Sequence, residues 1–253
     1  MARERITLLK IPVDVVPQED LETEIMAVLD RPQGNQIILL SLRDLLRARR
    51  NVEYRTIVNN AALVLPVSKS ILSAASFLKL TRPVRYNPFY FIIQLLGILE
   101  AHYKSAYLFG TRKKNLLRAE KNVKTTFPGL QIVGRCVGYY QKTGEKNIIS
   151  AIRKASPSLV LFTSGVPGRE RWFYRNRSNF ETGIFLWHPN VLDVFAERKK
   201  RTSQKLFDLG WEFLPELVKN PFKLFFIFPY VGYILILIYY RLFRTSKKTK
   251  ITG

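Results

Sequence analysis

The chain has 253 residues and carries 41 Lys and Arg against 19 Asp and Glu, which gives a formal net charge of +22. This length predicts one large domain, or one domain with an appendage. A hydrophobic content of 47% excludes a wholly disordered chain, and a single cysteine excludes a disulfide-stabilised miniprotein. The positive charge indicates a polyanionic partner: nucleic acid, an anionic membrane surface or a phosphate-bearing substrate.

The N-terminal segment has no secretory signal. Charged residues such as Arg5, Lys10 and Asp14 interrupt it before an apolar core of about seven residues develops. Cys136 has no partner for an intramolecular disulfide, as expected in a reducing compartment. These features predict a cytoplasmic location for most of the chain.

Short runs of β-branched and aromatic residues alternate with stretches of helical periodicity. This alternation predicts an α/β domain with a mostly parallel, doubly wound (Rossmann-like) sheet flanked by helices. We expect an N-terminal strand near Ile6–Val13, followed by strands at Gln36–Ser41, Ala61–Leu65, Ser105–Phe109, Leu130–Gly134, Leu159–Phe162 and Gly183–Trp187.

Helices are expected between the strands, where apolar residues recur with the helical period. Amphipathic helices are predicted at Asp20–Leu29, Thr111–Thr126 and Glu145–Lys154. Phe89–Leu99 is apolar throughout, but Glu100 ends it after about eleven residues, which is too short to cross a bilayer. We therefore predict a buried helix there.

The C-terminal part differs from the rest. Leu224–Tyr240 contains no charged residue, and about 17 residues is the lower limit for crossing a bilayer core. Its tyrosines and the basic residues on both sides are typical of a membrane interface. We predict a main domain over residues 1–200 and a membrane-associating appendage over residues 201–253. The alternative is an apolar helix packed on the main domain or in a dimer interface.

Two glycine-containing loops follow predicted strands, at the sheet edge where doubly wound domains bind ligands. Gly110 and Thr111 follow one strand and open a helix, which favours binding of a phosphate by free backbone N–H groups. The loop from Gly165 to Trp172 follows another strand in the same way. A tight turn and a helix cap are the alternatives in these loops, the latter also for Glu170.

Motifs for other chemistries are absent from the sequence. His102 and His188 are the only histidines and are not grouped with Cys136, so we predict no metal site and no cofactor. There is no nucleophile elbow, no Walker A loop and no dinucleotide-binding fingerprint. The basic cluster Arg198–Arg201 belongs to no recognisable nucleic-acid-binding module. The alternative interpretation is a solvated face of a helix.

Several motifs occur in the order found in the bacterial WecG/TagA/CpsF glycosyltransferases, family 26. The chain resembles that family almost from end to end, as a divergent member. The matching segments are Ala61–Pro66, Ala106–Gly110, Phe127–Gly134, Gly138-Tyr139-Tyr140, Gly165-x-Pro167-x-x-Glu170-x-Trp172, Leu192-Asp193, Arg201 and Gly210–Phe213.

The resemblance implies a membrane-associated enzyme of cell-surface polysaccharide synthesis, at the cytoplasmic face, peripheral or with one C-terminal anchor. Family members transfer an N-acetylhexosamine from a UDP donor to a sugar on undecaprenyl diphosphate. The resemblance places the donor near Gly110, Thr111, Pro167, Arg169 and Glu170, and it places Arg201 and Lys223 toward the diphosphates. An anionic membrane surface is a further expected partner, and an oligomer or a partner transferase is compatible with the resemblance.

One departure concerns the general base. The family carries a Pro-Asp-Gly turn where this chain has Pro66-Val67-Ser68, and valine cannot accept a proton. Ser68, Glu170 and Asp193 are the candidates near matched motifs. Two hypotheses follow: a transferase with relocated chemistry, or a catalytically inactive scaffold or regulatory subunit that binds membrane or a lipid diphosphate.

Overall fold

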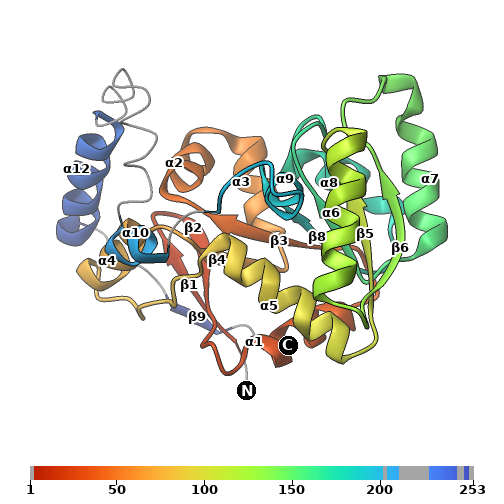
Figure 1. Cartoon of the computed structure of the whole chain (residues 1–253). Helices are drawn as coiled ribbons and strands as arrows, with labels where there is room; N and C mark the ends of the chain where they lie inside the picture. Colours follow the sequence, from red (N-terminus) through yellow and green to blue (C-terminus); the bar gives the residue numbers. More distant parts are fainter. Residues whose placement is uncertain (1–2, 202–203, 211–227, 244–247, 251–253) are drawn as a thin grey trace.

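The computed structural model describes residues 3–201, 204–210, 228–243 and 248–250. Its centre is a six-stranded sheet in the order β4-β3-β8-β7-β5-β6, and every pair of neighbours is parallel (Figure 1). The strands are β3 (Asn35–Leu40), β4 (Leu63–Pro66), β5 (Ser105–Phe109), β6 (Gln131–Cys136), β7 (Leu159–Phe162) and β8 (Ile184–Trp187). This confirms the predicted α/β, doubly wound fold.

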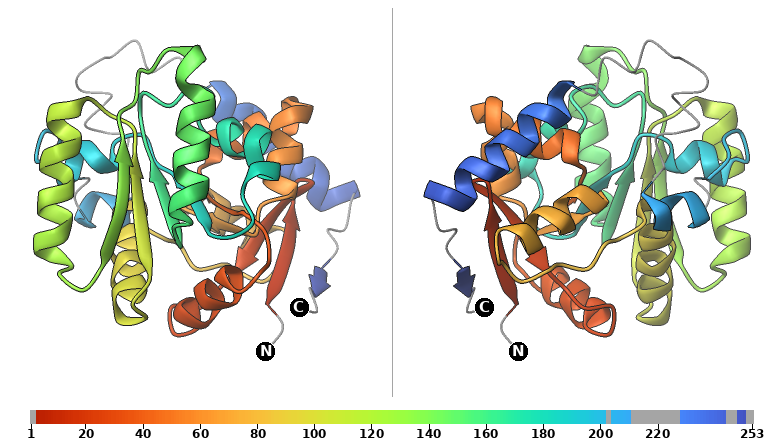
Figure 2. Two further views of the ribbon diagram at one scale, coloured as in Figure 1. Left: turned by 90° about the vertical axis from the view of Figure 1, so that its right-hand side faces the viewer. Right: turned by 90° about the vertical axis from the view of Figure 1, so that its left-hand side faces the viewer.

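Helices cover both faces of the sheet (Figure 2), which is why its inner strands are apolar along their whole length. Every residue of β4 and β7 is buried. One face packs against α1 (Leu21–Leu29), α5 (Pro88–Ala101), α6 (Lys113–Thr126) and α9 (Val191–Phe195). The other packs against α2 (Leu42–Arg50), α3 (Val52–Asn59), α7 (Glu145–Ala155) and α8 (Glu170–Asn176).

The predicted helices are confirmed, with ends that shift by one or two residues. The apolar segment Phe89–Leu99 lies within α5 as a buried helix. Asn87 begins it, because the side-chain oxygen of Asn87 accepts a hydrogen bond from the backbone N–H of Phe89 at 3.1 Å.

The prediction of one N-terminal strand is wrong. Two antiparallel strands, β1 (Glu4–Leu8) and β2 (Ile11–Val15), form a hairpin outside the parallel sheet. The turn consists of Leu9 and Lys10, whose φ angles are 52° and 71°. A two-residue turn of this kind normally contains Asn or Gly, so its sequence gave no signal.

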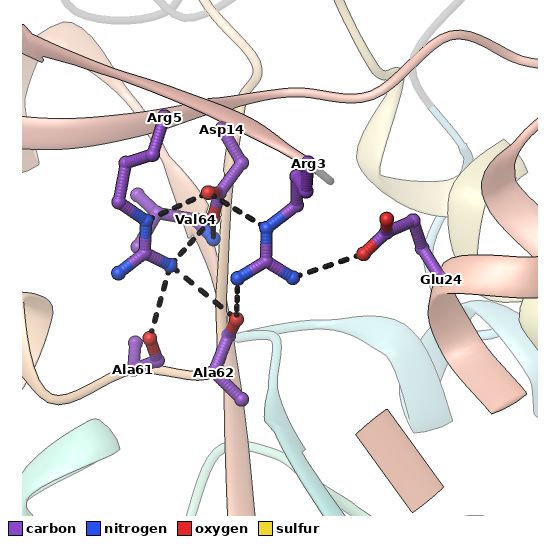
Figure 3. Close-up of polar contacts among 7 residues, drawn as sticks. All are labelled: Arg3, Arg5, Asp14, Glu24, Ala61, Ala62 and Val64. Carbon is purple, nitrogen blue, oxygen red and sulfur yellow. Dashed lines mark hydrogen bonds and ion pairs between the residues drawn. The ribbon is translucent and has the colours of Figure 1, made fainter. Parts of the chain in front are cut away.

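The hairpin is joined to β4 by a buried ionic cluster (Figure 3). Asp14 is fully buried, and Arg5 donates two hydrogen bonds to its carboxylate at 2.7 and 2.8 Å. Arg3 Nε lies 3.1 Å from the same carboxylate, and the backbone N–H of Val64 donates to it at 2.6 Å. The cluster therefore fixes the hairpin to the amino end of β4.

The described parts of the predicted appendage lie against the main domain. They are α10 (Gln204–Leu209), α12 (Phe228–Phe243) and β9 (Lys248–Lys250). Tyr233 on α12 donates a hydrogen bond to the carbonyl of Ser70 on α4 (Lys69–Phe77) at 2.9 Å, and β9 pairs with β1 (Figure 2).

The predicted segment Leu224–Tyr240 overlaps α12 from Phe228 onward, and residues 224–227 lie outside the described part of the chain. Among the described residues, no helix combines the length and apolar character that a membrane crossing requires.

Candidate active site

Three loops at the carboxyl end of the sheet are joined by backbone hydrogen bonds. They follow β5, β6 and β7. The N–H of Thr111 donates to the carbonyl of Ser164 at 2.7 Å, and the N–H of Gly138 donates to the carbonyl of Thr111 at 2.9 Å. The N–H of Tyr139 donates to the carbonyl of Gly165 at 2.7 Å. These bonds make one connected surface from segments that are far apart in the sequence.

Close packing explains the glycines in these loops. Gly110 has a φ of 125°, and a Cβ there would lie 2.7 Å from Cγ2 of Thr163. A Cβ on Gly138 would lie 2.9 Å from the Cα of Gly165. Side chains at both positions would push the loops apart, so these glycines serve the packing of the site.

Thr111 and Asp193 lie in direct contact. The hydroxyl of Thr111 donates to Oδ1 of Asp193 at 2.7 Å, and the amide of Asn115 donates to the same oxygen at 2.9 Å. Lys199 Nζ lies 3.9 Å from the other carboxylate oxygen. The structure thus brings two predicted site residues together. Asn115 and Lys199 were not singled out by the sequence, because they match no motif.

The loop between β7 and α8 carries Pro167, Arg169 and Glu170. Arg169 has a φ of 56°, and its guanidinium carbon lies 5.3 Å from the centre of the Trp187 ring at the end of β8. Pro167 lies in the turn before it. The positive charge of Arg169 is therefore held near the carboxyl ends of β7 and β8.

Glu170 is buried, and its Oε2 atom has no hydrogen-bond partner among the described residues. Burial raises the pKa of Glu170 to about 7, and the nearby carboxylate of Asp44 adds to this effect. Arg47 and Arg169 oppose it. A carboxyl group with this pKa can exchange a proton near neutral pH.

Val67, to which the resemblance assigns the position of the family's aspartate, follows the carboxyl end of β4. The carbonyl of Val67 accepts a hydrogen bond from Arg85 Nε at 2.8 Å, and Ser68 Oγ accepts one from the backbone N–H of Leu42 at 3.1 Å. Ser68 therefore contributes a hydrogen bond that supports the start of α2. The structure adds Asp44, whose carboxylate accepts a hydrogen bond from the hydroxyl of Ser41 at 2.5 Å.

Ser41 and Asp44 form a capping box at the start of α2. The Ser-x-x-Asp spacing is visible in the sequence, but this spacing marks the start of a helix and does not by itself mark a site residue. Within the described residues, no three His, Cys, Asp or Glu side chains are grouped closely enough to bind a metal ion.

Of the two cations predicted to face diphosphates, Arg201 lies with its guanidinium carbon 5.7 Å from the centre of the Tyr90 ring. It is thus placed over the first turn of α5. Lys223 lies outside the described residues.

A doubly wound sheet with connected glycine loops at its carboxyl edge is an architecture suited to binding a nucleotide. The model of the glycosyl transferase WecG/TagA/CpsF family matches residues 6–250. The chain belongs to this family, as its motifs predicted.

The chain is also similar to curated N-acetylglucosaminyldiphosphoundecaprenol N-acetyl-β-D-mannosaminyltransferases. It is 22% identical to the enzyme of Bacillus spizizenii over 193 residues, which cover 76% of this chain and 74% of that protein. It is 20% identical to the enzyme of Bacillus subtilis over 196 residues, or 77% and 75% of the two chains. A relative from Staphylococcus aureus is 21% identical over 161 residues, 64% of this chain and 63% of that protein. These matches give no support to the non-catalytic scaffold.

Proposed function

We propose that this protein is a membrane-associated transferase that moves an N-acetylhexosamine from a UDP donor to a sugar carried on a polyprenyl diphosphate. The product would serve cell-surface polysaccharide synthesis. The family match and the names of the relatives support the reaction class. The observation that carries the proposal is the contact between Thr111 and Asp193 within the connected loops.

The donor binds along the loops that follow β5, β6 and β7. Asp193 is held in place by donors, so it suits a fixed contact to a sugar or ribose hydroxyl. Tyr139 is 67% exposed and offers a flat face for a base. Arg169 supplies positive charge for the diphosphate, which leaves as the anomeric carbon–oxygen bond breaks. Pro167 and Gly110 shape the loops.

The acceptor hydroxyl must lose its proton as its oxygen bonds to the anomeric carbon. Val67 cannot take this proton. We assign the role to Glu170, whose unpartnered oxygen and pKa of about 7 suit a general base. Asp193 is less suited, because Thr111, Asn115 and Lys199 surround its carboxylate.

The exposed face of α12 supports peripheral membrane association. Tyr233, Leu237 and Tyr240 pack against the main domain. The opposite face exposes large apolar side chains, which are Val231, Ile234, Leu235, Ile238, Leu242 and Phe243. Such a helix lies in the interface with its apolar face in the lipid. Leu235→Asp should lower the fraction of protein that sediments with anionic vesicles, and unchanged sedimentation would contradict this role.

The test of the proposed reaction is a transfer assay with the purified full-length chain. UDP-N-acetylhexosamines serve as donors, and N-acetylglucosamine on a polyprenyl diphosphate serves as acceptor. We expect a disaccharide on the lipid with the inverted anomeric configuration. Lack of donor binding even at high donor concentration would contradict the proposal, while donor binding without transfer would favour the scaffold hypothesis.

A further inference from the structure

A groove of about 400 Å³ lies between α4, α5 and α10, beside the carboxyl end of β4. This volume is within the range of pockets that bind small ligands. Its lining combines cationic, aromatic, amide and acidic side chains, including Lys69, Arg82, Arg85, Tyr90, Phe207 and Asp208. Neither the family motifs nor the proposed donor site uses Lys69 or Arg82.

Two of the groove's cations lack an acidic partner. Lys69 and Arg82 are exposed and take part in no ion pair among the residues that the structure describes. Asp208 is the acidic residue in the lining, and Gln204 Nε2 donates to it at 2.8 Å. The three cations and the one carboxylate in the lining give the groove a net positive charge, which favours an anionic ligand.

Arg85 connects the groove to Val67, which stands where the resemblance places the family's aspartate. Its guanidinium carbon lies 3.6 Å from the centre of the Phe207 ring, and its Nε donates to the carbonyl of Val67 at 2.8 Å. The backbone of Tyr86 donates to the carbonyl of Pro66 at 3.0 Å. A ligand in the groove therefore ends beside the carboxyl end of β4.

The donor loops lie elsewhere on the same edge. In the strand order, β7 and β5 are three and four strands away from β4, which corresponds to about 14 to 19 Å across the sheet. In the proposed reaction, a nucleotide at Thr111 and Asp193 would have to direct its sugar toward β3 and β4 to meet an acceptor held beside β4. The groove approaches the same place from the other side.

The groove also adjoins the proposed membrane helix. Lys69 begins α4, and the next residue, Ser70, accepts the hydrogen bond from Tyr233 on α12. The cationic groove and α12 are therefore both in contact with α4. A lipid with an anionic head and an apolar chain has the matching arrangement.

We propose that the groove binds the diphosphate of the lipid-linked acceptor, with Lys69 and Arg82 as its unassigned phosphate contacts. This inference rests on the proposed function for the identity of the lipid. It separates two diphosphate sites: one for the donor at β5 and β7, and one for the acceptor at β4. Arg201 lies over Tyr90 on the groove wall, and its positive charge adds to that of the acceptor site.

The test compares two double variants of the full-length chain. Lys69→Ala/Arg82→Ala removes two charges from the groove. Lys146→Ala/Lys154→Ala removes two exposed charges from α7, which packs against the face of the sheet opposite α5. Charge-assisted contacts contribute about tenfold each, so loss of both should raise the acceptor KM by about a hundredfold in the groove variant alone, with an unchanged donor KM.

A second readout needs no turnover. Phosphatidylcholine vesicles containing either a polyprenyl diphosphate or the uncharged polyprenol are sedimented with each protein. We expect the wild type and the α7 variant to prefer the diphosphate vesicles, and the groove variant to lose that preference. Addition of free inorganic diphosphate should compete with the vesicles if the headgroup alone is recognised.

Three results would overturn the inference. A rise in donor KM instead of acceptor KM would assign the groove to the nucleotide. Equal losses in both double variants would indicate a general charge effect. If none of the proteins transfers sugar, the proposed function fails and the vesicle assay alone tests the groove. A preference for diphosphate vesicles that survives Lys69→Ala/Arg82→Ala then overturns the groove assignment.

Discussion

The amino and carboxyl ends of the central sheet treat a buried carboxyl group differently. At the amino end, the buried carboxylate of Asp14 is matched by Arg3, Arg5 and the N–H of Val64. At the carboxyl end of the sheet, Oε2 of the buried Glu170 has no hydrogen-bond partner within the described chain. Burial of a polar group without a partner costs stability. The first end is therefore built to hold the fold, and the second is suited to receive a ligand.

Three residues at the carboxyl end of the sheet have an unusual backbone conformation. Thr111, Tyr139 and Arg169 each lie in a loop that follows a strand, and their φ angles are 49°, 57° and 56°. Positive φ is unfavourable for residues with a side chain and is typical of binding and catalytic sites. Hydrogen bonds between the loops hold Thr111 and Tyr139 in place.

The largest effect is expected at the amino end. Asp14→Ala leaves the half-buried Arg5 without its carboxylate and leaves Arg3 with Glu24 alone, so the free energy of unfolding should fall by about 3 to 5 kcal/mol. Urea denaturation measures this change. Glu22→Ala is the control, because its side chain is 59% exposed and its ion pair with His102 should contribute less than about 1 kcal/mol. A similar small loss for Asp14→Ala would remove the distinction between the two ends.

The next effect concerns Glu170 at the carboxyl end. Because burial raises its pKa from 4.5 to about 7, the folded state binds more protons than the unfolded state across this window. Its contribution to stability therefore falls as the pH rises from about 4.5 to 7, by on the order of 3 kcal/mol. Glu170→Gln should remove this dependence and leave the variant more stable than the wild type at pH 8.

Catalysis should change in the opposite direction. A general base works when ionised, so wild-type transfer should increase as the pH rises through about 7, and Glu170→Gln should lower the rate by at least about a hundredfold. Denaturation and initial rates, each measured from pH 5 to 8, separate the two roles. If the variant keeps both its rate and the wild-type pH profile, the base lies elsewhere, and Asp44 is the first residue to test.

Burial of His188 complicates the stability measurement. Burial lowers the pKa of His188 to about 4, so its contribution is lost as the pH falls through the window from about 6.5 to 4. This opposes the effect of Glu170 below pH 6.5. Because His188 is present in both proteins, its effect cancels in the difference in stability between wild type and Glu170→Gln, and this difference should change mainly between pH 5 and 7.

The sequence predicted those parts of the fold that follow from local periodicity. Ser105–Phe109 and Leu159–Phe162 form strands with the predicted ends, because both are short apolar runs bounded by turn residues. The N-terminal hairpin was missed because Leu9 and Lys10 adopt positive φ without a turn motif. Rules based on local sequence do not account for the tertiary contacts that stabilise such a turn.

The candidate site was predictable only where motifs mark it. Thr111 and Asp193 were both singled out, but their contact spans 82 positions and follows from the strand order. The groove combines residues from α4, α5 and α10, which no spacing rule connects. Lys69 and Arg82 are ordinary surface cations in the sequence, and only their common groove suggests a shared ligand.

The smallest effect is expected from Asp193→Asn. Asparagine keeps the shape and one acceptor oxygen, so the hydrogen bond from Thr111 survives while the charge is lost. If this carboxylate contacts a donor hydroxyl, the donor Kd should rise about tenfold, because a charge-assisted hydrogen bond becomes a neutral one. Titrations with UDP and with a UDP-N-acetylhexosamine measure the change and distinguish a ribose contact from a sugar contact, and Asp208→Asn in the groove is the matched control.

The pair of variants also tests whether the two diphosphate sites are separate. Asp208→Asn removes a carboxylate from the groove and should leave the UDP Kd unchanged, while the acceptor KM should fall slightly because repulsion of the phosphates decreases. A change in UDP affinity of similar size in both variants would join the groove to the donor site. The carboxyl edge would then hold one extended nucleotide site rather than two sites that converge beside Val67.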